Sequence, residues 1–147
     1  MKVVIIGAGP VGCYAGYLFA KSGYEVSIYE NHPQIGLPIQ CTGILTSDFD
    51  QLGFPLDYFL VNTIKRIEVF SPNEKLSINQ KNYIVSRPNF DNFFADMARK
   101  AGANIFLSHN FISKEGEVLI IKNVQNKNEN KNENKNENKN ENKNENK

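Results

Sequence analysis

The sequence predicts an α/β fold that begins with a parallel strand–helix–strand unit. Three observations predict it: a β-branched run at Lys2–Ile6 bounded by glycine, an apolar pattern of helical period from Pro10, and a second strand-like run at Glu25–Tyr29. A strand, a helix and a strand within about 30 residues are typical of a βαβ crossover. The first strand is short, β-branched and continuously apolar, which indicates burial in a parallel sheet.

The expected helix ends near Ser22, because Gly23 supplies a C-terminal stop. One apolar stripe has the spacing i, i+4, i+7 and i+8 and is predicted to pack on the sheet: Val11, Ala15, Leu18 and Phe19. Gly16 extends the smooth face of the helix, and Cys13 is expected to be a small packed residue there. In the second strand, Val26 and Ile28 are expected on one face.

The turn between the first strand and the helix reads Gly7-Ala8-Gly9-Pro10-Val11-Gly12, which matches G-x-G-x-x-G. Gly7 permits the tight turn, Gly9 lets the backbone approach a pyrophosphate, and Gly12 allows close packing of helix and strand. The helix N-terminus offers free N–H groups and a positive dipole end to phosphates. The motif therefore predicts a Rossmann-type dinucleotide site that includes Gly7, Gly9, Pro10, Val11 and Gly12.

Glu30 closes the second strand 18 residues after Gly12, where a carboxylate can accept both ribose hydroxyl protons of the adenosine half. The neighbouring Asn31 is included in the predicted site. A carboxylate here argues against the 2′-phosphate of NADP. The unit alone does not decide between FAD and NAD, but its place at the N-terminus and the segment that follows favour FAD.

Residues 31–63 show no sustained period and are interpreted as a long functional loop with a short helix around Asp48–Leu52. Thr63–Phe70 and roughly Lys75–Asn79 predict a small β-hairpin insertion, and Tyr83–Val85 a third strand. A further helix is predicted between Pro88 and Gly102, with this apolar stripe: Phe90, Phe93, Phe94, Met97, Ala98 and Ala101. Strands are expected at Asn104–Leu107 and Glu117–Ile121.

The last 23 residues, 125–147, form a Lys-Asn-Glu-Asn repeat that lacks apolar side chains and is expected to be disordered. The predicted division is therefore an incomplete dinucleotide-binding domain at 1–124 and a low-complexity tail at 125–147. The tail holds six lysines and five glutamates, so the preceding part is formally neutral and shows no basic footprint for nucleic acid. Two cysteines are too few for a disulfide framework, and no metal site is expected at His32 or His109, which are interpreted as surface or loop residues.

The stretch Ile35-Gly36-x-Pro38-x-x-Cys41-x-Gly43 and the pair Arg87-x-x-x-Asp91 add a narrower signal. With the glycine motif and Glu30, they make residues 1–122 resemble the geranylgeranyl reductase family, flavoproteins within the larger class related to p-hydroxybenzoate hydroxylase. The resemblance implies an FAD-dependent oxidoreductase that reduces isoprenoid C=C bonds. It further implies a prenyl-lipid substrate, an external electron donor and peripheral contact with a membrane surface. The low cysteine count and the lack of a secretory signal before the first strand indicate a cytoplasmic protein.

The resemblance also assigns roles to three residues. Cys41 would lie beside the flavin as the candidate catalytic residue, and Gly43 would allow close backbone approach to the flavin. Arg87 would face a phosphate or ribose of FAD, and a cation at a helix N-terminus independently favours an anionic partner. The alternatives are that Cys41 is a small buried apolar residue and that Arg87 is solvated.

The chain ends before the second flavin-contacting segment and the substrate sheet of such enzymes could appear. It is therefore interpreted as the N-terminal part of the enzyme. Two rivals remain: an aromatic flavin monooxygenase of the same fold, and a non-catalytic remnant.

Overall fold

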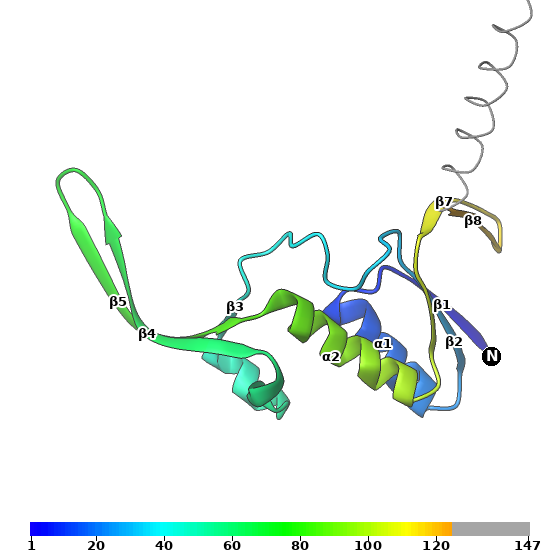
Figure 1. Ribbon diagram of the computed structural model, residues 1–147, viewed down its shortest axis with the longest axis horizontal. Coiled ribbons are helices and arrows are strands. Elements are labelled where there is room, and N and C mark those ends of the chain that lie inside the picture. The colour runs from blue at the N-terminus through cyan, green and yellow to red at the C-terminus, as the bar shows by residue number, and fades with distance from the viewer. Residues whose placement is uncertain (125–147) are drawn as a thin grey trace, which may run out of the picture.

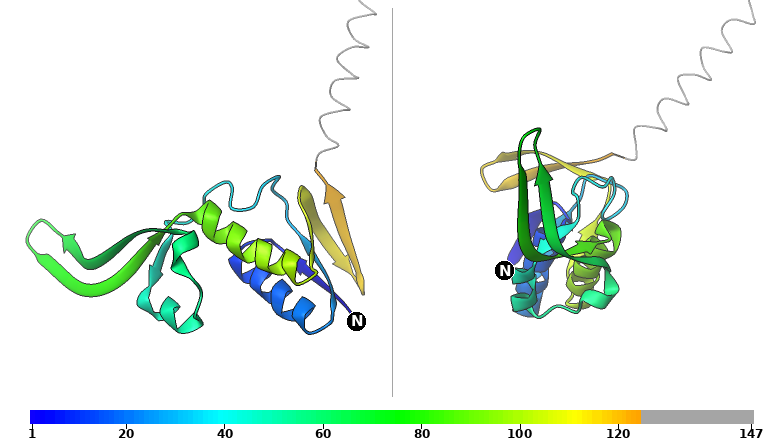
Figure 2. Two further views of the ribbon diagram at one scale, coloured as in Figure 1. Left: turned by 60° about the horizontal axis from the view of Figure 1, so that its bottom comes forward. Right: turned by 90° about the vertical axis from the view of Figure 1, so that its left-hand side faces the viewer.

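The computed structural model describes residues 1–124, and the predicted disordered tail lies outside these residues. A parallel sheet holds β1 (Lys2–Ile6), β2 (Glu25–Tyr29) and β6 (Asn104–Phe106) in the order β1-β2-β6. Helices α1 (Pro10–Lys21) and α2 (Arg87–Lys100) lie side by side along this sheet (Figures 1 and 2). The predicted α/β class and the βαβ unit are confirmed.

The α1 helix packs on the sheet through its smallest side chains. Cys13 and Gly16 are buried, and an ideal Cβ added to Gly16 would lie 2.5 Å from Cδ1 of Ile28. The stripe predicted from Val11, Leu18 and Phe19 is wrong, because these side chains are 84%, 45% and 42% exposed. The helix lies so close to β2 that large apolar side chains do not fit between the two elements.

A second, antiparallel sheet joins β3 (Ile44–Thr46), β4 (Leu60–Phe70) and β5 (Lys75–Val85) in the order β3-β5-β4. Tyr83–Val85 was predicted as a separate strand, which is wrong, because these residues continue β5; the third strand is β3, within the segment predicted as a loop. A 3₁₀ helix at Ser47–Leu52 matches the predicted short helix, and another covers Leu56–Tyr58.

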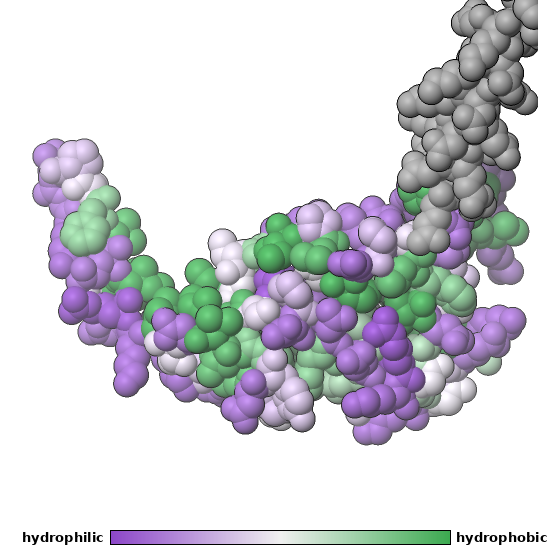
Figure 3. All heavy atoms as spheres, viewed as in Figure 1, coloured by the Kyte–Doolittle hydropathy of each residue, from purple (hydrophilic) through white to green (hydrophobic). Residues whose placement is uncertain are grey.

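The β4–β5 hairpin extends away from the helix pair (Figure 1). Apolar side chains of this hairpin are exposed, among them Val61 at 66%, Phe70 at 68% and Leu76 at 58%. Figure 3 shows hydrophobic residues continuing from the body of the molecule onto the hairpin. Such a continuous apolar surface is typical of a region that contacts another apolar surface.

Phenylalanine rings fill the space between α1, α2 and the second sheet. Phe59 is 1% exposed, its ring centroid lies 4.9 Å from that of Phe90, and Phe54 and Phe94 are 5.0 Å apart in an edge-to-face arrangement. The predicted stripe of α2 is largely confirmed, since Phe90, Phe94 and Ala98 are buried. This core fixes α2 and the loop after β2 in place beside the glycine motif.

A short hairpin follows β6 and consists of β7 (His109–Glu115) and β8 (Val118–Asn123). The strand predicted at Glu117–Ile121 corresponds to β8, whereas β7 was not predicted. Within residues 1–124, the structure has no helix that is both long and apolar enough to cross a bilayer.

Candidate functional site: the dinucleotide cleft

The glycine motif forms the turn from β1 into α1. Gly7 has φ +96°, and its N–H donates a hydrogen bond of 2.8 Å to the carbonyl of Tyr29, which fastens the turn to β2. A Cβ at Gly12 would overlap the Gly7 carbonyl oxygen. At Gly9, in contrast, an added Cβ would meet no described atom within 4 Å. Gly7 and Gly12 thus shape the turn, and the space beside Gly9 stays open.

The α1 N-terminus carries the features of an anion-binding end. Gly9 is the N-cap and Pro10 lies in the first turn, and among the described residues no side chain caps this end and no acidic residue lies in the first turn. First-turn N–H groups lack acceptors within a helix and sit at its positive dipole end. Val11, at 84% exposure, leaves this end accessible.

Glu30 follows β2 and turns its carboxylate toward the glycine motif. Its Oε2 accepts a hydrogen bond of 2.8 Å from the N–H of Ala8, and its Oε1 accepts one of 3.0 Å from the N–H of His32. Burial opposes ionisation of Glu30, but these amides and the His32 imidazole outweigh it and hold the pKa of the carboxyl below its ordinary value. Glu30 is therefore an oriented, ionised acceptor beside the turn.

His32 and His109 were predicted as surface or loop residues, which is confirmed for His32, in the loop after β2, and wrong for His109, which lies in a strand. The side chain of His32 is 35% exposed, and its Nδ1 lies 2.6 Å from Oε1 of Glu30. His109 begins β7 and is half-buried, with its Nδ1 2.7 Å from the carbonyl oxygen of Leu107. The strand β7, which the sequence pattern did not reveal, packs against β2 and brings His109 to this region.

A cleft of about 260 Å³ opens between the glycine motif, the segment after β2 and the start of α2. Among its lining residues are Ala8, Gly9, Glu30, Asn31 and Arg87. Three segments far apart in the sequence therefore contribute predicted site residues to one cleft. The other predicted residues, Gly7, Pro10, Val11, Gly12, Cys41 and Gly43, lie outside its lining.

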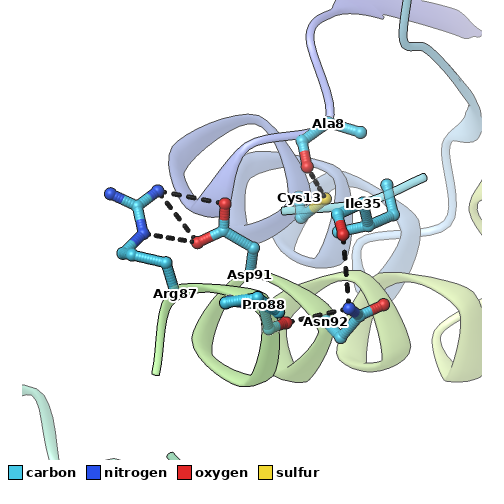
Figure 4. A network of polar contacts seen from close by, with 7 residues as sticks. All are labelled: Ala8, Cys13, Ile35, Arg87, Pro88, Asp91 and Asn92. Atoms are coloured by element: carbon cyan, nitrogen blue, oxygen red, sulfur yellow. Dashed lines mark hydrogen bonds and ion pairs between the residues drawn. The ribbon is translucent and has the colours of Figure 1, made fainter. Parts of the chain in front are cut away.

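Arg87 begins α2 and forms a paired contact with Asp91, one turn later (Figure 4). Nε and Nη2 of Arg87 lie 3.0 Å from Oδ1 and Oδ2 of Asp91, and the side chains are 22% and 8% exposed. Arg87 is thus not a solvated surface residue. The anionic partner expected at this helix N-terminus is supplied in this structure by the chain itself, although Arg87 and Asp91 both line the cleft.

The segment after β2 docks closely on α2. A Cβ at Gly36, which has φ +74°, would lie 2.8 Å from Cα of Pro88. The side-chain amide of Asn92 donates to the carbonyls of Pro88 at 2.8 Å and Ile35 at 3.5 Å (Figure 4). Only glycine fits at position 36, so this contact holds one wall of the cleft against the helix.

Cys41 is exposed, so the alternative that it is a small buried apolar residue is wrong; Cys13 is the buried cysteine, as predicted. The N–H of Gly43 and the guanidinium of Arg87 stabilise the Cys41 thiolate and lower the pKa of the thiol. Gly43 has φ +70°, and an added Cβ would lie 2.6 Å from the carbonyl oxygen of Val85. Because Gly43 has no side chain, this segment can lie close enough to β5 for the Val85 N–H to donate to the Gly43 carbonyl.

Sequence reasoning missed two contributors to the cleft. The Ala8 amide holds Glu30, and the His32 imidazole contacts the same carboxylate. The available signal was the position of His32 two residues after Glu30 at the end of a strand, where its backbone N–H can turn back to the carboxylate.

Comparison with known proteins gives consistent results. A family model described as an NAD(P)-binding Rossmann-like domain matches residues 5–64. A digeranylgeranylglycerophospholipid reductase of Methanocaldococcus jannaschii is 36% identical over 118 residues, which is 77% of this chain and 30% of that protein. The chain spans about a third of the length of the first such relatives it matches.

Solved structures agree with this result. A geranylgeranyl bacteriochlorophyll reductase-like protein of Thermoplasma acidophilum is 27% identical with a TM-score of 0.67, over 80% of this chain and 33% of that one. A myxobacterial chondrochloren halogenase, described as a new variant of FAD-dependent halogenases, shares the fold at 18% identity and a TM-score of 0.63, over 84% and 33% of the two chains. The predicted resemblance to the N-terminal part of the geranylgeranyl reductase family and the predicted Rossmann-like fold are thus confirmed.

Proposed function

We propose that this chain binds FAD and forms the cofactor-binding part of an FAD-dependent oxidoreductase of the geranylgeranyl reductase type, which reduces isoprenoid C=C bonds. One observation carries the proposal. The ionised carboxylate of Glu30 lies across the glycine motif, in the same cleft as Gly9 and Arg87. A carboxylate beside an uncapped helix N-terminus provides the two contacts that an adenosine diphosphate group requires, one to the ribose and one to the phosphates.

The predicted residues that line the cleft each have a role in this proposal. The first N–H groups of α1 hold the pyrophosphate, and the open space beside Gly9 lets the phosphates approach the backbone. Glu30 accepts hydrogen bonds from the ribose hydroxyls, with Asn31 beside it in the cleft lining. Arg87 adds positive charge at the far wall while Asp91 keeps its guanidinium oriented.

The cleft also supports an unphosphorylated ribose. A 2′-phosphate would lie against the Glu30 carboxylate, whose lowered pKa keeps it charged at neutral pH. Two negative groups within hydrogen-bond distance repel each other strongly. FAD fits this constraint, whereas NADP does not.

The bound flavin would supply two-electron redox chemistry at the isoalloxazine ring. The chain would bind and orient it, and the Cys41 thiol, with Arg87 and the Gly43 amide beside it, would present a polar group just after residues 34–40, which line the cleft. In a protein of the relatives' length, we propose a prenyl-lipid substrate, an external electron donor and peripheral contact with a membrane surface. The relatives' name as digeranylgeranylglycerophospholipid reductases supports this substrate class.

Ligand titration of the full 147-residue chain tests the cofactor assignment. We expect FAD and ADP to bind, measured by flavin fluorescence and by calorimetry, and 2′-phospho-ADP-ribose to bind far more weakly than ADP-ribose. Glu30→Gln should weaken ADP binding by about 10- to 100-fold, because charge-assisted hydrogen bonds to the ribose are lost. Glu25→Gln is the matched control, since Glu25 begins the same strand and pairs with the exposed Lys2.

A folded chain that binds neither FAD nor ADP would contradict the cofactor assignment and favour a non-catalytic remnant. The reaction class is tested separately, with a protein of the relatives' length. Reoxidation of its reduced flavin by a prenyl lipid supports the reductase, whereas reoxidation that depends on oxygen and an aromatic substrate supports a monooxygenase.

A further inference from the structure

His32 contacts the one carboxylate that the proposed function assigns to ribose. Its Nδ1 lies 2.6 Å from Oε1 of Glu30, and the backbone N–H of the same residue donates to the same oxygen at 3.0 Å. A carboxylate is an acceptor, so Nδ1 carries a proton and donates. His32 thus gives Oε1 two hydrogen bonds, and the Ala8 amide gives Oε2 one.

The count of acceptor sites has a consequence for ligand binding. A carboxylate has about four lone-pair sites, roughly two on each oxygen. With three protein donors in place, Oε2 keeps one free site and Oε1 keeps none. A ribose with both hydroxyls free brings two donors, and a 2′,3′-diol reaches both oxygens of one carboxylate. The second hydroxyl therefore requires that one protein donor leaves Oε1.

The imidazole is the donor that can leave. The two amides belong to backbone that is fastened nearby: the Gly7 N–H donates to Tyr29, the His109 N–H to the carbonyl of Glu30, and the Ser108 N–H to the carbonyl of His32. The imidazole, in contrast, turns about its side-chain torsions and is 35% exposed on a residue that lines the cleft.

We propose that the His32 imidazole occupies the position of a ribose hydroxyl on Glu30 and is displaced when a nucleotide with a free ribose diol binds. His32 is then a positioning residue that acts through Glu30. In the free protein it holds the carboxylate in place across the glycine motif, and on binding it competes with the ligand. This inference rests on the proposed dinucleotide function and concerns the adenosine half alone.

The test compares ADP with 2′,3′-dideoxy-ADP, which lacks the diol, on the full chain and on His32→Ala. Removal of the competitor should tighten ADP binding by about 3- to 10-fold, the value of roughly one net hydrogen bond. Binding of the dideoxy compound should not change. A merely structural effect of the substitution would instead change the binding of both compounds. Gln34→Ala is the matched control, because Gln34 lines the same cleft without contacting Glu30 in the described structure.

A second measurement uses the unaltered chain and does not depend on the stability of any variant. The ¹⁵N resonance of the His32 Nδ1 should move toward that of a free imidazole when ADP is added, and should not move with dideoxy-ADP. Unchanged or weaker ADP binding by folded His32→Ala, or an Nδ1 resonance that ignores ADP, would overturn the inference while leaving the dinucleotide site intact. Failure of the unaltered chain to bind ADP or FAD at all would instead refute the proposed function.

Discussion

Gly12→Ala should destabilise the chain by about 2 kcal/mol. The added Cβ would overlap the carbonyl oxygen of Gly7, which belongs to the backbone of the turn and is held by the Gly7 hydrogen bond to Tyr29. Overpacking typically costs about 1–3 kcal/mol, and a backbone neighbour that cannot rotate away places this site at the upper end. Alanine recovers up to about 1 kcal/mol through its higher helix propensity.

Gly16→Ala in the same helix is the matched control. Its Cβ would meet Cδ1 of Ile28, the end of a side chain, at 2.5 Å. We expect a cost of about 1 kcal/mol, because Ile28 can shift its terminal methyl group, and this cost is nearly offset by the gain in propensity. The two substitutions share their chemistry and their helix, so the difference between them isolates the contact with the turn.

Urea unfolding followed by circular dichroism measures both free energies of unfolding on the full chain. The reasoning would be refuted if the free energy of unfolding of Gly12→Ala lay within about 0.5 kcal/mol of that of the unaltered chain, because ordinary surface substitutions have effects of this size. It would be refuted equally by a larger loss for Gly16→Ala than for Gly12→Ala, because the turn would then not be the tight contact.

Three further predictions concern charge and reactivity. Because folding lowers the pKa of Glu30, the ionised carboxylate stabilises the fold above its unfolded pKa, and this stabilisation is lost as the pH falls through the folded pKa. Urea unfolding between pH 6 and 3 should therefore show a steeper loss of stability for the unaltered chain than for Glu30→Gln. Arg87→Ala and Asp91→Ala should each destabilise the chain by about 2 kcal/mol, because each leaves its partner's charge unpaired. In a double-mutant cycle the double substitution should cost clearly less than the sum of the two, whereas additive losses would show that the pair is not coupled. Burial raises the pKa of the Cys13 thiol to about 12, whereas the exposed Cys41 has a lowered pKa, so iodoacetamide at neutral pH should label Cys41 alone, and Arg87→Gln should slow that labelling.

Local sequence patterns predicted the elements that depend on near neighbours. The β-branched run of β1, the stop at Gly23 and the Pro88-to-Gly102 helix were confirmed within a few residues. The apolar stripe predicted for α1 was wrong, because a periodic pattern identifies the buried face of a helix from its large apolar side chains. The close approach of α1 to the sheet is made by Cys13 and Gly16, which such a pattern does not weight.

The second sheet was predicted only in part for a related reason. β3 is three residues long and has no period of its own, and it exists because it pairs with β5. Likewise, β5 continues through residues that the sequence separated into two strands, because β4 pairs with it on both sides of a register shift and β3 pairs with its end. Strand boundaries are decided by pairing with residues distant in the sequence.

The sequence by itself determined the βαβ unit, the glycine turn and the position of Glu30 at the end of β2. These features depend on residues within about one supersecondary unit, where backbone preference and side-chain period act directly. Tertiary structure alone decided that Arg87 reaches the same cleft as Glu30, that Asp91 pairs with Arg87, and that His32 contacts the Glu30 carboxylate. Those contacts depend on the packing of α2 and of the segment after β2 against the glycine turn, and packing between distant segments leaves no periodic mark on the chain.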